Sequence, residues 1–224
     1  MNKIFWAGDS TVQNNTLATY PQTGIGQVFP MYVREGVFVL NYAKNGRSTK
    51  SFMDEGRLDA IDRELGEGDF LFIQFGHNDE KVQDLARYTE PFSTYVKNLE
   101  TYIDTARRHG AYPVLITPIE RRLFDEKGML IESAHTDYVD AMKQTAKKNN
   151  VPLVDLFSES RAVLERAGEE KSRKWYMFFG EKKDNTHLRY DGALMYAGFI
   201  AEGLRGLGGI YAALIESRTE ETQE

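Results

Sequence analysis

The chain has 224 residues, of which 41% are hydrophobic and 28% are charged, and its formal net charge is −6. This length allows one α/β domain with a real core, because a chain of this size buries roughly 70% of its extended surface on folding, and we expect that domain to span residues 1–215. The negative charge disfavours a surface for nucleic acid or anionic membranes. The absence of cysteine excludes disulfides, thiolate nucleophiles and cysteine-bound metals.

Five short, mostly apolar segments alternate with longer amphipathic ones, which is typical of a parallel sheet covered by helices on both faces. Strands that are buried on both faces lack the polar alternation of exposed strands, and these segments share that character. The expected strands are Lys3–Ala7, Val37–Tyr42, Phe70–Phe75, Pro113–Thr117 and Leu153–Asp155. We therefore expect a three-layer αβα, flavodoxin-like fold with a five-stranded parallel sheet.

Three helices are predicted from the periodicity of apolar residues. The first spans Phe92–His109, where apolar residues recur every three or four positions, and it ends before Gly110. The second spans Thr136–Asn149. The third begins near Asp191, a favourable N-cap residue, and ends at Gly208-Gly209.

Residues 210–215 are expected to pack on the core rather than to form an oligomer contact, and the acidic segment 216–224 is expected to be a disordered tail. No run of apolar residues approaches the length of a signal-peptide core or a membrane span. The sequence thus predicts a cytoplasmic protein without membrane or nucleic-acid partners, and it leaves the oligomeric state open.

Three polar loops directly follow the first three expected strands, and they contain Ser10, Gly46 and Asn78, respectively. Open parallel sheets bind ligands beyond the carboxyl ends of their strands, so these loops are expected to converge at one edge. A hydroxyl, a glycine N–H and a side-chain amide are groups that acyl transfer uses. Each loop alone is equally compatible with an ordinary turn or helix cap. Their combination favours a catalytic site.

A fourth segment, Asp184-Asn185-Thr186-His187, comes just before the last expected helix. A serine hydroxyl needs a base to take its proton, and histidine is the usual base near neutral pH. A carboxylate three residues earlier in one turn can reach the histidine ring and fix its tautomer. Alone, His187 and Asp184 are compatible with ordinary surface residues. Beside the three loops, they favour a catalytic base with its orienting carboxylate.

These residues resemble the four sequence blocks of the SGNH or GDSL hydrolases, and the resemblance spans residues 8–187. The blocks are, in order, Gly8-Asp9-Ser10, Gly46, Gly76-x-Asn78-Asp79 and Asp184-x-x-His187. Flanking strings look like the rhamnogalacturonan acetylesterase branch of that superfamily; they include Asn45-Gly46-Arg47-Ser48 and Thr117-Pro118-x-x-Arg121-Arg122.

The resemblance implies a role for each matched residue, and it implies neither a metal nor a cofactor. Ser10 is the implied nucleophile, His187 the general base and acid, and Asp184 the carboxylate that orients it. The N–H groups of Ser10 and Gly46 and the side-chain amide of Asn78 are the implied oxyanion hole. The third block contains His77, which is not expected to be the base because it lies beside the oxyanion donor.

The implied partner is an acetylated oligosaccharide, most specifically acetylated rhamnogalacturonan of the plant cell wall. The aromatic loop Lys171–Lys183 contains Trp175, which is a candidate for stacking on a sugar ring, although its aromatic residues are also compatible with core packing. Arg47 and Arg121 are candidates for binding a uronate carboxylate. Arg122 and Arg189 are further candidates, and all four are also compatible with ordinary surface ion pairs.

Two other functions remain open at this point: a GDSL-type thioesterase or lysophospholipase, and a non-catalytic doubly wound binding module. The chain lacks a Gly-x-Ser-x-Gly elbow, which disfavours the usual α/β-hydrolase fold. It also lacks a phosphate-binding loop and a dinucleotide fingerprint, which disfavours nucleotide binding. The function that the resemblance implies is that of a carbohydrate acetylesterase.

Overall fold

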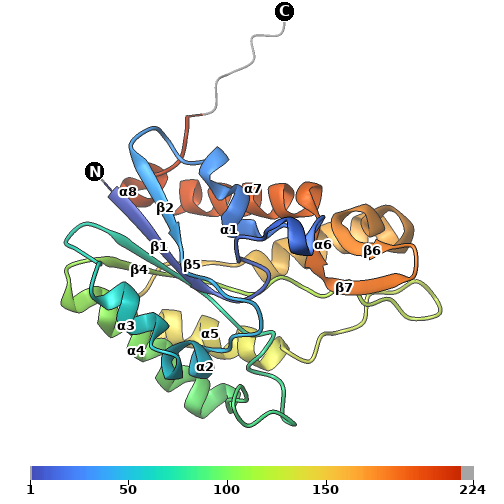
Figure 1. Ribbon diagram of the computed structural model, residues 1–224, viewed down its shortest axis with the longest axis horizontal. Coiled ribbons are helices and arrows are strands. Elements are labelled where there is room, and N and C mark those ends of the chain that lie inside the picture. Colours follow the sequence, from blue (N-terminus) through green and yellow to red (C-terminus); the bar gives the residue numbers. More distant parts are fainter. Residues whose placement is uncertain (1, 218–224) are drawn as a thin grey trace, which may run out of the picture.

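A computed structural model describes residues 2–217, and its elements form three layers around a central sheet (Figure 1). The sheet has five parallel strands in the order β2-β1-β3-β4-β5. They are β1 (Asn2–Gly8), β2 (Val37–Asn41), β3 (Phe70–Gln74), β4 (Tyr112–Ile116) and β5 (Leu153–Val154). The expected three-layer fold with a five-stranded parallel sheet is confirmed, and each expected strand agrees with the observed one to within one residue at either end.

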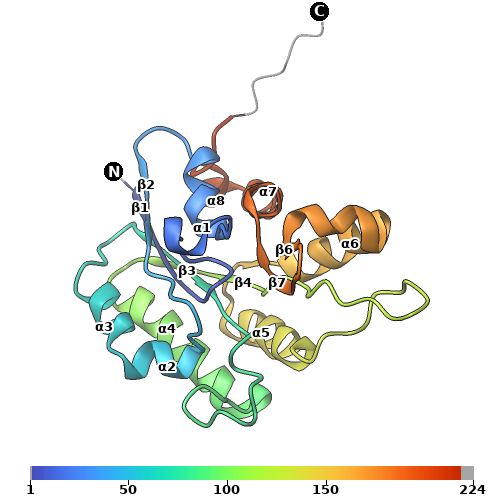
Figure 2. The ribbon, with the colours of Figure 1, turned by 45° about the vertical axis from the view of Figure 1, so that its right-hand side comes forward.

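Successive strand residues face opposite layers, so each face of the sheet has its own core. In β1, Ile4 and Trp6 belong to one buried cluster, whereas Phe5 and Ala7 belong to the other. The first cluster is covered by α1 (Ile25–Val28) and α7 (Tyr190–Leu207), and the second by α2 (Thr49–Asp54), α3 (Arg57–Asp62), α4 (Val96–Arg108) and α5 (Thr136–Asn149). Figure 2 shows these two sets of helices on opposite sides of the sheet.

The helix expected over Phe92–His109 begins differently from the prediction. Residues Pro91–Tyr95 form a π-helical turn, and α4 follows it. The π turn holds more residues than an α-helical turn and therefore shifts the phase of the apolar stripe. As a result Phe92, expected on the buried face, is 53% exposed. The prediction of α5 is confirmed at both ends.

The last long helix, α7, begins at Tyr190, so the prediction that Asp191 is its N-cap is wrong. Arg189 occupies that position, with extended backbone that is held by a hydrogen bond from its N–H to the carbonyl of Trp175 (2.9 Å). A tertiary contact therefore sets the start of this helix. Its end at Leu207, before Gly208, agrees with the prediction.

The residues after α7 pack only in part on the core. They begin with the short helix α8 (Gly209–Ala212). Leu214 and Ile215, which follow it, are buried, whereas Ile210 within it is 43% exposed. Of the tail expected over 216–224, residues 218–224 lie outside the described residues, and Glu216 donates its N–H to the carbonyl of Tyr32 (2.8 Å). No helix within residues 2–217 is long and apolar enough to cross a membrane.

The segment between β5 and α7 departs most from the prediction. It contains α6 (Leu156–Ser172), which is kinked at Gly168, and an antiparallel pair, β6 (Tyr176–Phe179) and β7 (Lys182–Leu188), where an aromatic loop was expected. The hairpin connection, residues 180–181, begins with Gly180 at φ +56°, a conformation that glycine adopts readily in tight hairpins. This hairpin projects beyond the central sheet beside α6 (Figure 1).

Candidate active site

The three predicted loops meet at the carboxyl ends of β1, β2 and β3. The first connection adds β2 on one side of β1 and the later connections add strands on the other side, so the strand order reverses between β1 and β3, which is where doubly wound sheets bind their ligands. Ser10 and Asn78 follow these two strands, and Gly46 follows β2. All three residues line a surface hollow of about 360 Å³, together with His187. The structure thus brings the four predicted segments together.

Ser10, His187 and Asp184 form a continuous hydrogen-bonded chain. Nε2 of His187 lies 2.9 Å from the hydroxyl oxygen of Ser10, and Nδ1 lies 2.7 Å from Oδ2 of Asp184. The other oxygen of Asp184 accepts the backbone N–H groups of Thr186 (3.0 Å) and His187 (2.9 Å). Burial by itself raises the pKa of Asp184, but the hydrogen bonds from His187 and the backbone together lower this pKa to about 2.

A wide bulge in β7 makes this arrangement possible. Tyr176 pairs with Leu188, and Phe178 pairs with Lys183, so β6 advances by two residues where β7 advances by five. The residues 184–187 therefore leave the regular ladder and turn back on themselves. Bulges commonly re-aim side chains near active sites, and here the ring of His187 faces Ser10 while the carboxylate of Asp184 contacts the other side of that ring.

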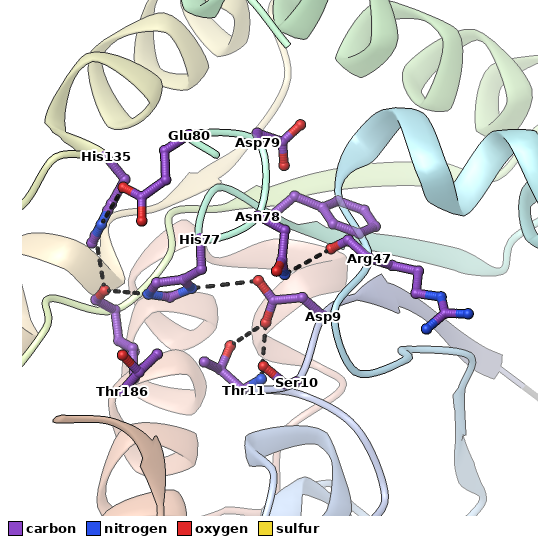
Figure 3. Close-up of polar contacts among 12 residues, drawn as sticks. Asp9, Ser10, Thr11, Arg47, His77, Asn78, Asp79, Glu80, His135 and Thr186 are labelled. Carbon is purple, nitrogen blue, oxygen red and sulfur yellow. Dashed lines mark hydrogen bonds and ion pairs between the residues drawn. The ribbon is translucent and has the colours of Figure 1, made fainter. Parts of the chain in front are cut away.

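The residues that supply the predicted oxyanion donors line the same hollow as the Ser10 hydroxyl. The backbone of Gly46 has φ +77°, which favours glycine, and the N–H groups of Ser10 and Gly46 donate to no other residue among 2–217. One hydrogen of the Asn78 amide is donated to the carbonyl of Arg47 (3.1 Å), as Figure 3 shows. Lys81 donates to the amide oxygen of Asn78 (2.8 Å), which fixes the orientation of this amide.

A buried network lies behind Ser10 and Asn78 (Figure 3). One carboxylate oxygen of Asp9 accepts the N–H (2.9 Å) and the hydroxyl (2.8 Å) of Thr11, and the other lies 3.4 Å from Nδ1 of His77. The Nε2 atoms of His77 and His135 both contact the carbonyl oxygen of Ile119, at 3.0 and 3.1 Å. Burial lowers the pKa of His77, and the adjacent Asp9 opposes this effect. This network joins the nucleophile loop to the loop of Asn78.

Arg121 connects the same network to the bulge of β7. Its guanidinium donates to the hydroxyl of Thr186 (3.1 Å) and to the carbonyl of His77 (3.3 Å), and it forms an ion pair with Glu80. Arg121 lines the hollow, as expected for a residue that contacts a ligand. Its contacts also bring the loops of Asn78 and His187 into one unit.

Arg47 and Trp175, which were also predicted as substrate contacts, lie outside this hollow. The guanidinium of Arg47 forms an ion pair with Glu55 (2.9 Å) and donates to the carbonyl of Asn45 (2.7 Å). Trp175 lines a separate hollow with Arg173 and other residues of that segment. The aromatic segment is divided between core and surface, because Tyr176 is fully buried and its neighbour Phe179 is 42% exposed.

Arg122 is buried rather than exposed to a ligand. Its guanidinium donates to the hydroxyl of Ser172 (3.0 Å), to the side-chain oxygen of Asn185 (2.9 Å) and to the carbonyl of Glu169 (2.5 Å), and it stacks on the ring of Phe178 at 4.7 Å. Because every one of these partners belongs to α6 or the hairpin, Arg122 holds the bulge against α6.

Several residues of the site had no counterpart in the sequence predictions. Gln22 lines the hollow because its segment forms a bridge with Arg189, a pairing across more than 160 residues that no local pattern indicates. Lys81 follows Asn78 at a spacing of three, which was the available signal for their contact. No group of three His, Asp or Glu side chains among residues 2–217 is arranged to hold a metal ion.

A serine hydroxyl, a histidine and an aspartate hydrogen-bonded in this order are the arrangement that serine hydrolases use, and here it lies at the switch point of a parallel sheet. Residues 7–193 match the model of the GDSL-like Lipase/Acylhydrolase family, and the chain belongs to this family. The protein is therefore a carboxylic ester hydrolase.

Named relatives support this assignment. The chain is 43% identical to the rhamnogalacturonan acetylesterase RhgT of Bacillus subtilis over 215 residues, covering 92% of this chain and 90% of the relative. It is also 43% identical to the probable rhamnogalacturonan acetylesterase YesY of the same organism, over 92% of this chain and 94% of the relative. The crystal structure of the Bacillus subtilis protein YxiM superposes with a TM-score of 0.81 at 27% identity, covering 92% of this chain and 57% of that one.

Proposed function

We propose that this protein is a serine esterase that removes acetyl groups from acetylated rhamnogalacturonan oligosaccharides through an acyl-enzyme. The observation that carries the proposal is the hydrogen-bonded chain from Ser10 through His187 to Asp184, beside free N–H donors. The printed names of the two relatives at 43% identity support the choice of acetyl group and glycan.

Acylation begins when Nε2 of His187 takes the proton of Ser10 as its oxygen attacks the acetyl carbonyl carbon. Asp184 holds the ring in the tautomer with Nδ1–H and stabilises the imidazolium that forms. The negative oxygen of the tetrahedral intermediate accepts the N–H groups of Ser10 and Gly46 and the second amide hydrogen of Asn78. Such fixed donors stabilise the developing charge more than they stabilise the neutral ester.

The intermediate collapses when His187 gives its proton to the sugar oxygen, which leaves as a hydroxyl group. A water molecule then attacks the acetylated Ser10, and His187 takes the proton of that water. The second tetrahedral intermediate uses the same donors. Its collapse releases acetate and returns a proton to Ser10.

The lining of the hollow favours a short acyl group. Its walls are polar or charged side chains and glycine, and no aliphatic or aromatic hydrocarbon side chain lines it; the lining residues are Ser10, Gln22, Asn45, Gly46, His77, Asn78, Lys81, Arg121, Thr186 and His187. A long acyl chain gains about 0.8 kcal/mol for each CH₂ that it buries against apolar surface, and the lining residues include no hydrocarbon side chain against which it could pack. Acetyl esters therefore fit better than the esters of a lysophospholipase or long-chain thioesterase.

The test combines covalent labelling with substrate comparison. A fluorophosphonate is expected to label Ser10, and Ser10→Ala is expected to lower kcat by ~10⁴-fold or more. Acetate release from acetylated rhamnogalacturonan fragments, and an acetyl-to-butyryl preference of ~10-fold or more on nitrophenyl esters, are also expected. Labelling of another serine contradicts the mechanism. Equal rates on octanoyl and acetyl esters, without acetate from the fragments, move the substrate to the lipase or thioesterase class.

A further inference from the structure

A second, larger hollow adjoins the catalytic one. It has a volume of about 710 Å³, within the range of small-molecule sites, and Gln22 lines both hollows. The segment 15–23 forms one wall, and the residues Arg189–Asp191 at the start of α7 form another. Because Arg189 follows His187 by two residues, this hollow lies at the same edge of the molecule as the site of acetyl transfer.

Two aromatic side chains line this second hollow and remain accessible. Tyr20 is 79% exposed and Tyr190 is 48% exposed. Exposed aromatic faces that gather at a concave surface are typical of binding sites, because a ring offers apolar area with a polar end. A sugar ring, with C–H groups on its faces and hydroxyl groups at its rim, matches such a surface.

A cation without a carboxylate partner lies in the same wall. No Asp or Glu within residues 2–217 lies within 4.0 Å of the guanidinium of Arg189, which instead stacks on the ring of Phe179 at 5.7 Å. The hollow also contains the first turn of α7, which has no side-chain cap and carries the partial positive charge of a helix N-terminus. Asp191 is the one acidic residue of the lining, and it offsets part of this charge.

Gln22 connects the two hollows chemically. Its side-chain nitrogen is buried and has no hydrogen-bond partner in the structure, although its residue lies at the boundary of both hollows. Buried polar groups are nearly always hydrogen-bonded, so this nitrogen is a donor in need of an acceptor. A ligand that spans both hollows supplies one as a ring, glycosidic or hydroxyl oxygen.

We infer that this second hollow, which we call the flanking subsite, binds a uronic acid residue of the oligosaccharide whose acetylated unit lies at Ser10. Arg189 donates to the uronate carboxylate, Tyr20 and Tyr190 contact the sugar faces, and Gln22 donates to an oxygen between the two sugar positions. This inference rests on the proposed function, because it places the acetylated unit of the same oligosaccharide at Ser10. It adds a charge-specific contact that a simple acetyl pocket lacks.

The first experiment compares three substrates: acetylated rhamnogalacturonan oligosaccharides, acetylated xylo-oligosaccharides, which carry no charge, and 4-nitrophenyl acetate. In Arg189→Gln, the kcat/KM for the charged oligosaccharide, divided by that for 4-nitrophenyl acetate, is expected to fall about tenfold, since a hydrogen bond to a charged group is lost. The ratio for the neutral oligosaccharide is expected to change less than about twofold. Arg189→Lys is expected to retain part of the selectivity.

Arg173→Gln is the matched control. Arg173 also stacks on an aromatic ring of β6, that of Phe178 at 5.0 Å, but it lines the separate hollow that contains Trp175. Loss of this charge is expected to leave both substrate ratios unchanged. Equal effects of the two substitutions, or no effect of Arg189→Gln, overturn the subsite. The effect of Arg189→Gln is expected to shrink with added salt, because salt screens exposed charges.

A binding measurement separates this inference from the proposed function. Deacetylated rhamnogalacturonan oligosaccharide is titrated into Ser10→Ala and into Ser10→Ala/Arg189→Gln, and the second protein is expected to bind it about tenfold more weakly. If the wild-type enzyme releases no acetate from rhamnogalacturonan but this difference is found, the proposed function fails and the subsite stands. If acetate is released and the two proteins bind equally, the subsite fails and the proposed function stands.

Discussion

Two aspartates near the site have opposite pKa shifts because their surroundings differ. Asp184 is only half-buried, and hydrogen bonds that favour its charged form lower its pKa to about 2. Asp79 is fully buried; burial raises its pKa to about 7, although it accepts hydrogen bonds from Thr49 and Thr89. Asp184 thus stays charged throughout the range in which a histidine base works, whereas Asp79 loses its proton only near neutrality.

Asp184→Asn is expected to lower kcat by up to ~10⁴-fold, because an amide no longer stabilises the imidazolium or selects its tautomer. The pH dependence of stability supplies a second readout. Since the pKa of Asp184 in the folded protein, about 2, lies below the ordinary 3.8, its contribution is present above pH 3.8 and is lost as the pH falls toward 2. Urea unfolding between pH 2 and 5 should show that the free energy of unfolding falls less in the variant than in the wild type as the pH is lowered. If the wild type and the variant lose the same free energy of unfolding between pH 5 and 2, the lowered pKa of Asp184 is contradicted.

Asp79→Asn is expected to remove a loss of stability that occurs as the pH rises, whereas Asp184→Asn removes one that occurs as the pH falls. The folded-state pKa of about 7 exceeds the ordinary 3.8, so folding favours the protonated form, and this stabilisation is lost as the pH rises from about 4 through 7. The loss amounts to about 4 kcal/mol at most, at 1.4 kcal/mol per unit. Unfolding in urea from pH 4 to 8 should show a flatter profile for the variant. Asp140→Asn, at an exposed position of α5, is the control and should leave the slope as in the wild type.

Asn78→Ala tests the oxyanion donor. The loss of one donor from such a site costs ~10²–10³ in kcat with little change in KM, because the donor acts on the transition state. Steady-state kinetics with 4-nitrophenyl acetate measures both constants. An increase confined to KM would assign Asn78 to substrate binding instead.

At the scale of elements, the hairpin β6–β7 depends on α6 for its position. The bulge that carries Asp184 and His187 is tied to α6 through Arg122, whose backbone N–H also donates to the carbonyl of Asn185 (2.9 Å). The hairpin itself has only two short strands, and such a pair is marginally stable on its own. Its catalytic geometry therefore depends in part on the contact with α6.

Arg122→Gln is expected to lower the free energy of unfolding by ~2–4 kcal/mol, because three buried hydrogen-bond partners and an aromatic contact lose the guanidinium. At a temperature where the variant stays folded, kcat on 4-nitrophenyl acetate is expected to fall about tenfold as the bulge loosens. Denaturant unfolding and kinetics on the same preparation provide the two measurements. A stability loss without any change in kcat would show that the bulge keeps its geometry independently of Arg122.

At the scale of the whole molecule, the sheet assembles a site from positions distant in the chain. Ser10 and His187 are 177 residues apart, yet they share a hydrogen bond of 2.9 Å. The layer formed by α7 is essential for this, because α7 starts three residues after His187 and packs along one face of the sheet. The stability of that layer and the position of the base are thus coupled.

Ile200→Ala, which truncates a fully buried residue of α7, is expected to cost about 2–5 kcal/mol of unfolding free energy, since it removes core contacts and leaves a cavity. Leu207→Ala on the same helix, at a position that is 38% exposed, should cost less than about 1 kcal/mol. Thermal or urea unfolding compares the pair. Equal costs would contradict the packing of α7 against the sheet.

The sequence predicted the sheet well because its strands are mostly apolar along their length, a strong local signal; the expectation that all five are buried on both faces is wrong for the edge strand β2, where Phe38 is 50% exposed. Local signals also predicted the bounds of α5, through its apolar periodicity, and the end of α7, through the glycines that follow it. No local signal predicted the start of α7, because this start depends on a hydrogen bond from Arg189 to Trp175. The domain boundary at residue 215 and the cytoplasmic location stay predictions.

The sequence by itself determined the order of the strands along the chain and the chemical groups that follow them, including Ser10, Asn78 and His187. Their identities are properties of single residues, so the sequence alone reveals them. Only the tertiary structure decided which side chains meet. Hydrogen bonds across 60 residues or more placed Arg121 at Thr186 and Arg122 at Asn185, and the pairing of Gln22 with Arg189 formed the flanking subsite. Such contacts depend on packing and strand order, and these emerge only when the whole chain folds.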